Sequence, residues 1–115
     1  MSKVLIVDDS RLSVAALQNM IQRIGHDVVG VAYNGEEAIK KVEQLEPDVV
    51  TLDFVMPDIN GAEVAKKIRS IKSTIKIIMI TNDELPIGTK NEIQAQAYIL
   101  KPITVRKLET AFSEL

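Results

Sequence analysis

Two neighbouring carboxylates, Asp8 and Asp9, directly follow an apolar run in the segment VLIVDDS. Placing like charges side by side at the edge of a core costs free energy unless a positive charge lies nearby. The pair therefore either faces water or holds a cation. An isolated aspartate pair usually faces water, so other residues of the chain must decide between these interpretations.

Three more residues that could take part in the same chemistry follow other apolar runs. Asp53 comes after VVTL, Thr81 after IIMI and Lys101 after AYIL. Taken singly, each has an ordinary explanation as a turn residue, a β-branched strand residue or the start of a loop. If the runs are parallel strands of one sheet, however, their carboxyl ends meet at the edge where such folds bind ligands. The carboxylates, the hydroxyl and the ammonium would then converge on one site.

Such a group of acids favours a bound metal ion. Three carboxylates within a few ångströms of one another should not all ionise without a counter-charge. Lys101 supplies one positive charge, and a divalent cation could supply the rest. Oxygen ligands and an open site suit Mg²⁺, which keeps several waters and accepts a phosphate oxygen. The chain has no cysteine and one histidine, His26, which falls away from this edge, so zinc is not expected there.

Five short apolar runs alternate with segments that have helical spacing. The runs are mostly continuous, which is typical of strands covered on both faces. They are Val4–Val7, Val28–Ala32, Val49–Leu52, Ile75–Ile80 and Tyr98–Leu100. This alternation predicts an α/β fold of the flavodoxin-like, doubly wound type, with a five-stranded parallel sheet in the order 2-1-3-4-5 and about five helices.

Polar residues and glycine mark the starts of four helices. Ser10 and Asn34 are expected to cap two of them, and the others begin near Gly61 and Thr104. The expected core-facing row of the first helix is Leu12, Ala16, Met20 and Ile24.

The fourth helix is the least regular element in the predicted fold. Pro86 and Gly88 lie where it should begin, and glycine is a weak helix former. We therefore expect a shortened or irregular helix from about Thr89 to Gln96.

Size and composition restrict the class of protein. The 115 residues suit one domain with an ordinary core, and 46% hydrophobic residues exclude a disordered tail. Lys and Arg number 14 and Asp and Glu 16, so the net charge of −2 gives no basic excess for nucleic acid. No apolar stretch reaches the roughly 20 residues that span a bilayer, and the N-terminus does not resemble a signal peptide. We expect one cytoplasmic domain over 1–115 that neither binds nucleic acid directly nor inserts into a membrane.

The segments VLIVDDS, VTLDFVMPDINGAEV, IIMIT and AYILKP resemble, in this order, the receiver domain of two-component response regulators. The resemblance covers nearly the whole chain and is closest to single-domain regulators of the chemotaxis type. It implies a stand-alone response regulator without an output domain, phosphorylated by a sensor histidine kinase or a phosphotransfer protein. It also implies Mg²⁺ as cofactor and no enzymatic activity beyond self-catalysed phosphoryl acceptance and autodephosphorylation.

At the matching positions, the resemblance implies roles for individual residues. Asp53 would be the phosphoacceptor, attacking a phosphohistidine of the partner to form an acyl phosphate. Asp9 would bind Mg²⁺ directly and Asp8 largely through water. Asp53 and the backbone carbonyl of Val55 would complete the metal ligands from the protein.

Further residues would respond to the phosphoryl group or modulate it. Lys101 would pair with its oxygens, and Thr81 would donate a hydroxyl to one of them. Tyr98 matches the aromatic residue whose rotamer follows phosphorylation. The resemblance implies a cis bond between Lys101 and Pro102, aiming the lysine inward, although such bonds in general favour trans. Downstream protein targets would dock on the face formed by the fourth helix, fifth strand and fifth helix.

The chain departs from the family pattern in two places. Asn82 follows Thr81 where a small alanine or glycine is more usual, so we expect Asn82 to alter the lifetime of the acyl phosphate. The segment between Thr81 and Lys101 is slightly shorter than usual. This difference leaves the identity of the partner and the switch route through Tyr98 open.

Three other functions fit the sequence less well. An adaptor that resembles a receiver but is not phosphorylated would normally have lost an acid or the lysine, and none is lost here. A phosphatase with an aspartate nucleophile would place a second aspartate two residues after Asp53, where Val55 stands. A flavin-binding protein would need a phosphate-cradling loop after the first strand, where DDSRLS is acidic. The adaptor is the main alternative.

Overall fold

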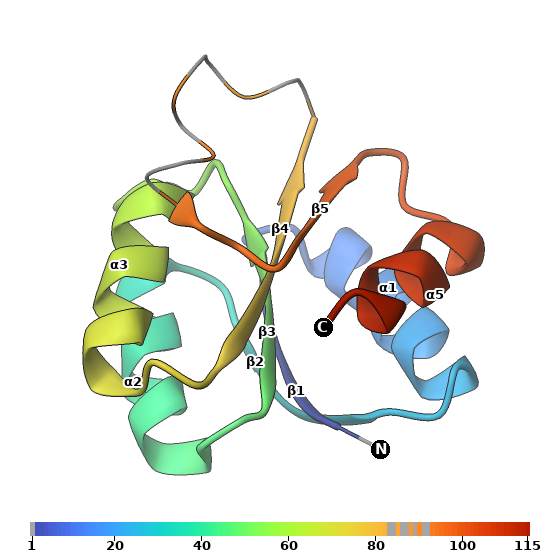
Figure 1. Cartoon of the computed structure of the whole chain (residues 1–115), viewed down its shortest axis with the longest axis horizontal. Coiled ribbons are helices and arrows are strands. Elements are labelled where there is room, and N and C mark those ends of the chain that lie inside the picture. Colours follow the sequence, from blue (N-terminus) through green and yellow to red (C-terminus); the bar gives the residue numbers. More distant parts are fainter. Residues whose placement is uncertain (1, 83–84, 86–87, 89, 91–92) are drawn as a thin grey trace.

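Five parallel strands form one sheet in the order β2-β1-β3-β4-β5 in the computed structural model of the chain (Figure 1). The structure describes residues 2–82, 85, 88, 90 and 93–115. The strands are β1 (Lys3–Val7), β2 (Asp27–Ala32), β3 (Val49–Asp53), β4 (Lys76–Thr81) and β5 (Ala97–Leu100). Their order and parallel direction confirm the predicted flavodoxin-like, doubly wound α/β fold.

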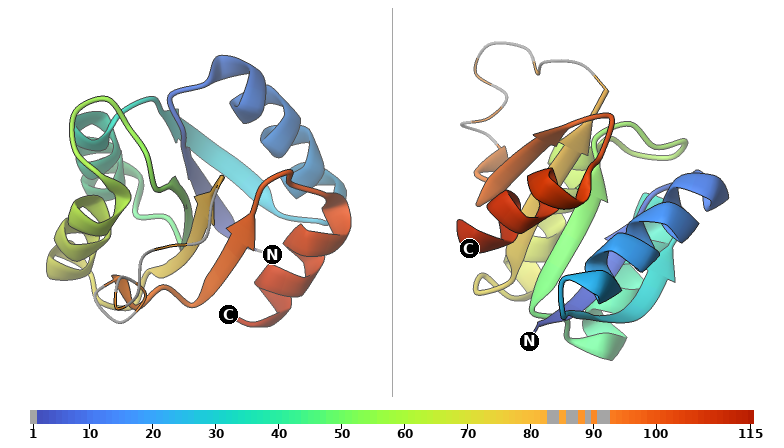
Figure 2. Two further views of the ribbon diagram at one scale, coloured as in Figure 1. Left: turned by 90° about the horizontal axis from the view of Figure 1, so that it is seen from above. Right: turned by 90° about the vertical axis from the view of Figure 1, so that its right-hand side faces the viewer.

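Helices cover both faces of the sheet. In the described part of the chain they are α1 (Arg11–Arg23), α2 (Gly35–Leu45), α3 (Gly61–Ile71) and α5 (Val105–Ser113). Helices α2 and α3 lie on one face, and α1 and α5 lie on the other (Figure 1, Figure 2). In β1, Leu5 packs on the α2–α3 side and Ile6 on the α1–α5 side. Because both faces are buried, the strands are continuous apolar runs. None of these described helices is long and apolar enough to cross a bilayer.

Short polar side chains begin the helices, as the sequence predicts. The Ser10 hydroxyl accepts a hydrogen bond from the Ser13 amide at 3.2 Å, at the start of α1. At the start of α2, the Asn34 side chain accepts one from the Glu37 amide at 2.8 Å. Thr104 caps α5 in the same way. Each bond satisfies an amide that has no partner within its own helix.

The predicted core-facing row of α1 is correct only in its second half, because Met20 and Ile24 pack against the core and the first two residues do not. Leu12 is 84% exposed, and Ala16 is exposed as well. The buried residues of α1 are Val14, Leu17 and Ile21. A row of residues four apart drifts by about 40° per step around a helix with 3.6 residues per turn, so it leaves the core face within three steps. Alternating steps of three and four residues stay on that face.

The predicted fourth helix, from about Thr89 to Gln96, falls partly outside the described residues and stays a prediction. In the part that the structure describes, Ile93 is buried in the core beside α3. The Gln94 amide donates to the Lys90 carbonyl at 2.9 Å, and Gln94 itself has a φ of 53°. The guanidinium of Arg69, on α3, donates to the carbonyls of Ile93 and Gln94. These bonds attach the end of this segment to α3.

A buried hydroxyl in β3 gives the first testable prediction. The side-chain oxygen of Thr51 has no hydrogen-bond partner among the described residues. We expect Thr51→Val to raise the free energy of unfolding by about 1 kcal/mol, because it removes an unpaired polar group and keeps the branched shape. Urea unfolding measures the change, and Thr110→Val on the exposed side of α5 is the control. A loss of stability in Thr51→Val alone would contradict the prediction.

Candidate functional site

The predicted acids meet at the carboxyl edge of the sheet. Asp8 follows β1 and Asp53 ends β3, and these strands are neighbours, with Val7 opposite Leu52. One carboxylate oxygen from each of Asp8, Asp9 and Asp53 lies within 4.8 Å of the other two. Asp8 is 3% exposed and Asp53 7% exposed, whereas Asp9 faces solvent. The cluster is therefore buried on one side and open on the other.

Lys101 is the cation of this site. Its Nζ lies 3.3 Å from Oδ2 of Asp53 and 4.0 Å from Oδ2 of Asp8. The backbone amide of Lys101 donates to the Thr81 carbonyl at 2.8 Å, which places the residue beside the end of β4. The Lys101-Pro102 peptide bond is cis, as the resemblance implied. The predicted lysine and acids thus lie together.

Burial and crowding raise the pKa of Asp8. The largest cause is its removal from water, and the negative charge of Asp53 acts in the same direction. A hydrogen bond from the Ser10 amide at 2.9 Å and the charge of Lys101 oppose the rise in this pKa but do not cancel it. The folded protein therefore holds the Asp8 proton more tightly than a solvated aspartate does, because burial disfavours the charged form and the neighbouring negative charge adds to this effect.

The donor set fits Mg²⁺. The candidate ligands are all oxygen atoms, they are close together, and one side of the cluster is open to water and to a further oxygen ligand. Among the described side chains, three carboxylates face one ammonium, so a divalent cation would balance the remaining charge. The acids at this position are therefore compatible with the predicted metal site.

Three further predicted site residues, Val55, Thr81 and Asn82, lie on the segments that directly follow or end β3 and β4. The amide of Val55 donates to Oδ1 of Asp53 at 3.3 Å, so this residue is adjacent to the acids. Thr81 ends β4, next to β3, and is buried. Asn82 follows it and is exposed. The metal-ligand role of the Val55 carbonyl and the switch role of Thr81 stay predictions.

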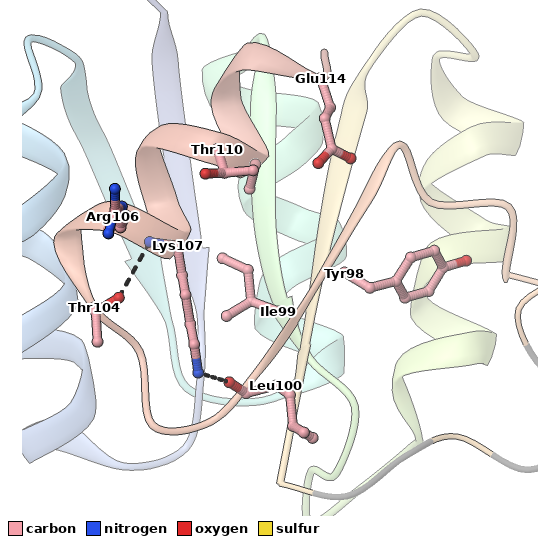
Figure 3. A pocket seen from close by; sticks show the side chains of 9 residues that line it. Tyr98, Ile99, Leu100, Thr104, Arg106, Lys107, Thr110 and Glu114 are labelled. Atoms are coloured by element: carbon pink, nitrogen blue, oxygen red, sulfur yellow. Dashed lines mark hydrogen bonds between the residues drawn. The ribbon is translucent and has the colours of Figure 1, made fainter.

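Tyr98 is held by the segment before β5. Its hydroxyl donates to the Lys90 carbonyl at 3.1 Å and accepts from the Ala95 amide at 3.2 Å. The ammonium of Lys90 also lies 4.9 Å from the centre of the ring. Figure 3 shows the ring pointing away from Thr104 and Lys107. In this conformation the hydroxyl of Tyr98 is bonded to backbone groups of residues 90 and 95, and its switch role stays a prediction.

Sequence reasoning missed two charged residues that hold the loops around the acids. The ammonium of Lys107 donates to the carbonyl of Leu100 at 2.9 Å (Figure 3). It also donates to the carbonyl of Pro102 at 2.9 Å, so it bonds to the residues on both sides of Lys101. The carboxylate of Asp58 accepts hydrogen bonds from backbone amides at the start of α2. Neither residue has a distinguishing sequence signal, because a lysine on a helix and an acid in a loop usually face solvent.

Comparison with known proteins decides the family. The family model of the response regulator receiver domain matches residues 4–113. The chain belongs to this family. This receiver domain is 33% identical over 115 residues to chemotaxis protein CheY of Thermotoga maritima, covering 98% of this chain and 96% of CheY. The match confirms the family that the motifs predicted.

Longer relatives and a solved structure agree with this assignment. The receiver domain is 38% identical over 108 residues to PhoP, the alkaline phosphatase synthesis transcriptional regulatory protein of Bacillus subtilis. That match covers 92% of this chain and 45% of PhoP, so the receiver domain spans less than half the length of that relative. A chain of the CheX-CheY-BeF3-Mg complex from Borrelia burgdorferi superposes with a TM-score of 0.87 at 30% identity, over 96% of this chain and 85% of that one.

Proposed function

We propose that this receiver domain accepts a phosphoryl group on Asp53 in a reaction that requires Mg²⁺. One observation carries the proposal: Asp53 lies in a cluster with Asp8 and Asp9, and its Oδ2 is 3.3 Å from the ammonium of Lys101. A nucleophilic carboxylate and positive charge at the same point are what phosphoryl transfer needs, because the protein mainly positions groups and neutralises charge.

The reaction is a nucleophilic displacement at phosphorus. A carboxylate oxygen of Asp53 attacks the phosphorus of a phosphohistidine on a sensor kinase or phosphotransfer protein. The new O–P bond forms as the P–N bond breaks, and the electron pair of the P–N bond stays on the imidazole. Lys101 offsets the charge of the transferred oxygens, and Thr81 donates its hydroxyl to one of them. When held by Asp9, Asp53 and the Val55 carbonyl, and by Asp8 largely through water, Mg²⁺ would supply additional positive charge to these oxygens.

The acyl phosphate would act by shifting the receiver domain between two packings. A phosphoryl group at Asp53 adds charge and acceptor oxygens, which would draw Thr81 inward and favour a different position of Tyr98. β5 and α5 form a pocket of about 480 Å³ near this residue (Figure 3). Apolar Ile99 and Ala111 line it together with charged Arg106 and Glu114. A downstream protein would bind this face, and the structural neighbour from Borrelia burgdorferi shows that a receiver of this fold can form a complex with another protein, CheX.

Intact mass spectrometry tests the acceptor. After incubation with acetyl phosphate and Mg²⁺, the wild-type protein should gain one phosphoryl group, and Asp53→Asn should gain none. Asp27→Asn, an exposed aspartate at the start of β2, is the matched control and should be modified like the wild type. An unmodified wild-type protein would support the unphosphorylated adaptor instead. Steady turnover of many phosphate esters would indicate a phosphatase.

Asn82 gives a prediction about the lifetime of the acyl phosphate. Asn82 is exposed and directly follows Thr81, at the edge where the acids lie, so its side chain would hinder the approach of water to a phosphoryl group on Asp53. We expect Asn82→Ala to shorten the half-life several-fold. Phosphorylated protein is separated from acetyl phosphate, and the loss of the phosphoryl group is followed by intact mass. Indistinguishable half-lives would reject this role of Asn82.

A further inference from the structure

The loop between β3 and α3, residues 54–60, contains Val55 next to the acids, and backbone hydrogen bonds hold its two ends. The Phe54 amide donates to the Ile80 carbonyl at 2.9 Å, and the Gly61 amide donates to the Phe54 carbonyl at 2.6 Å. A Cβ at Gly61 would lie 2.7 Å from the Cα of Phe54, so only glycine allows this approach. These contacts fix the two ends of the loop. Val55 follows the first end and its amide donates to Oδ1 of Asp53 at 3.3 Å, whereas Asp58 lies in the middle of the loop.

Asp58 attaches the middle of this loop to the first turn of α2. Its Oδ1 accepts hydrogen bonds from the amides of Gly35 and Ile59, each at 2.9 Å. Its Oδ2 accepts one from the amide of Glu36, also at 2.9 Å. The amides at a helix start lack partners within the helix and lie at the positive end of its dipole, which suits a carboxylate. The bonds from Gly35 and Glu36 hold the pKa of Asp58 below its ordinary value, so the side chain is ionised at neutral pH.

An apolar contact attaches the loop at the same point. A Cβ at Gly35 would lie 2.4 Å from Cγ1 of Ile59 and 3.0 Å from Cγ2 of Val64. The side chain of Ile59 therefore packs directly on the backbone of α2, where any larger residue than glycine would displace it. Hydrogen bonds and packing thus fix the loop against α2 independently of each other.

We propose that Asp58 is a positioning residue for the metal site, because it docks the loop on α2 and thereby fixes the Val55 carbonyl relative to Asp53. The inference rests on the proposed function, in which that carbonyl binds Mg²⁺. Only Met56 and Pro57 separate Val55 from Asp58. Met56 is buried, and the ring of Pro57 fixes the φ angle of that residue. The position of Asp58 is therefore transmitted to Val55 through a short segment with little conformational freedom.

Magnesium affinity, measured by isothermal titration calorimetry with MgCl₂, tests the inference. We expect Asp58→Ala to raise the Mg²⁺ dissociation constant about tenfold. This is the low end of the loss of affinity that is typical when a residue that orients metal ligands is replaced. Asp58→Asn keeps one acceptor oxygen and should recover part of the affinity. Asn34→Ala is the matched control, because Asn34 caps the same helix through the Glu37 amide without any recorded bond to the loop. Its dissociation constant should stay within about twofold of the wild type.

Amide hydrogen exchange in the metal-free protein is a second readout that does not depend on Mg²⁺. The amide of Val55 should exchange faster in Asp58→Ala and at the wild-type rate in Asn34→Ala. The amide of Ile59 is not informative, because Asp58→Ala removes its hydrogen-bond acceptor directly. Equal exchange in both variants, or equal loss of Mg²⁺ affinity in both, would overturn the inference, because Asp58 would then act only as a helix cap. A wild-type protein without Mg²⁺ affinity would instead contradict the proposed function, and the exchange rates would still decide whether Asp58 docks the loop.

Discussion

Asp8→Asn should raise the free energy of unfolding of the metal-free protein at neutral pH and weaken Mg²⁺ binding at least about tenfold. Burial and the charge of Asp53 raise the pKa of Asp8, so ionising it in the folded state costs free energy. Each unit by which the folded pKa exceeds the unfolded one corresponds to about 1.4 kcal/mol. The asparagine side chain keeps an oxygen that can accept the hydrogen bond from the Ser10 amide, but this side chain carries no charge.

The sign of the pH dependence follows from the raised pKa. As the pH rises from the ordinary aspartate value of 3.8, the unfolded chain loses its Asp8 proton before the folded protein does. The metal-free wild type therefore loses stability through the raised pKa of Asp8, and Asp8→Asn does not. The stability difference between them should be largest at neutral pH and shrink as the pH falls toward 3.8.

Urea unfolding in EDTA at several pH values measures this difference, and titration with MgCl₂ measures the metal affinity. Asp27→Asn is the control, because Asp27 is exposed at the start of β2. If the metal-free Asp8→Asn protein is less stable than the wild type at neutral pH, the charge of Lys101 already offsets the cost of ionising Asp8 in the folded state. Unchanged Mg²⁺ affinity would exclude Asp8 from the metal site.

Lys101→Met should slow formation of the acyl phosphate by about two orders of magnitude, because it removes positive charge from the point where phosphoryl oxygens are stabilised. In the described part of the chain, Lys101 is the one cation paired with Asp8 and Asp53. The methylene chain of methionine preserves most of the packing. Lys101→Arg keeps the charge with a different geometry, so it should retain part of the rate.

The rate is measured as phosphoryl incorporation from acetyl phosphate over time, at saturating Mg²⁺. Lys76→Met, at the exposed start of β4 and far along that strand from Thr81, is the control for loss of a lysine charge. A wild-type rate for Lys101→Met would show that the metal alone neutralises the transferred group.

The sequence predicted the strands and the acidic cluster because both depend on simple patterns. A parallel sheet needs continuous apolar runs, and its topology brings the residues that follow β1, β3 and β5 to one edge. Asp8, Asp53 and Lys101 could therefore be placed together from the sequence alone. Helix starts were also predictable, because Ser10 and Asn34 cap through local bonds to residues three positions ahead.

Features that depend on contacts between distant segments could not be predicted in this way. The core face of α1 is set by how the helix lies on the sheet, and Leu12 at the end of a regular row proved to be exposed. Asp58 accepts hydrogen bonds from the amides of Gly35 and Glu36, which lie 23 and 22 residues earlier in the chain. Lys107 bonds to carbonyls only a few residues earlier, but these bonds form only because the loop after β5 turns back toward α5. Nothing in the local pattern distinguishes such residues from other charged surface residues.

The pairing of β1 with β3 has a consequence for folding kinetics. Asp8 and Asp53 are separated by about two fifths of the chain. They are brought together by the pairing of β1 with β3, in which Val4 lies opposite Val49. A chain that stops before β3 would contain the aspartate pair without a binding site. If the metal site forms only after the rate-limiting step, Mg²⁺ should slow unfolding and leave the refolding rate nearly unchanged.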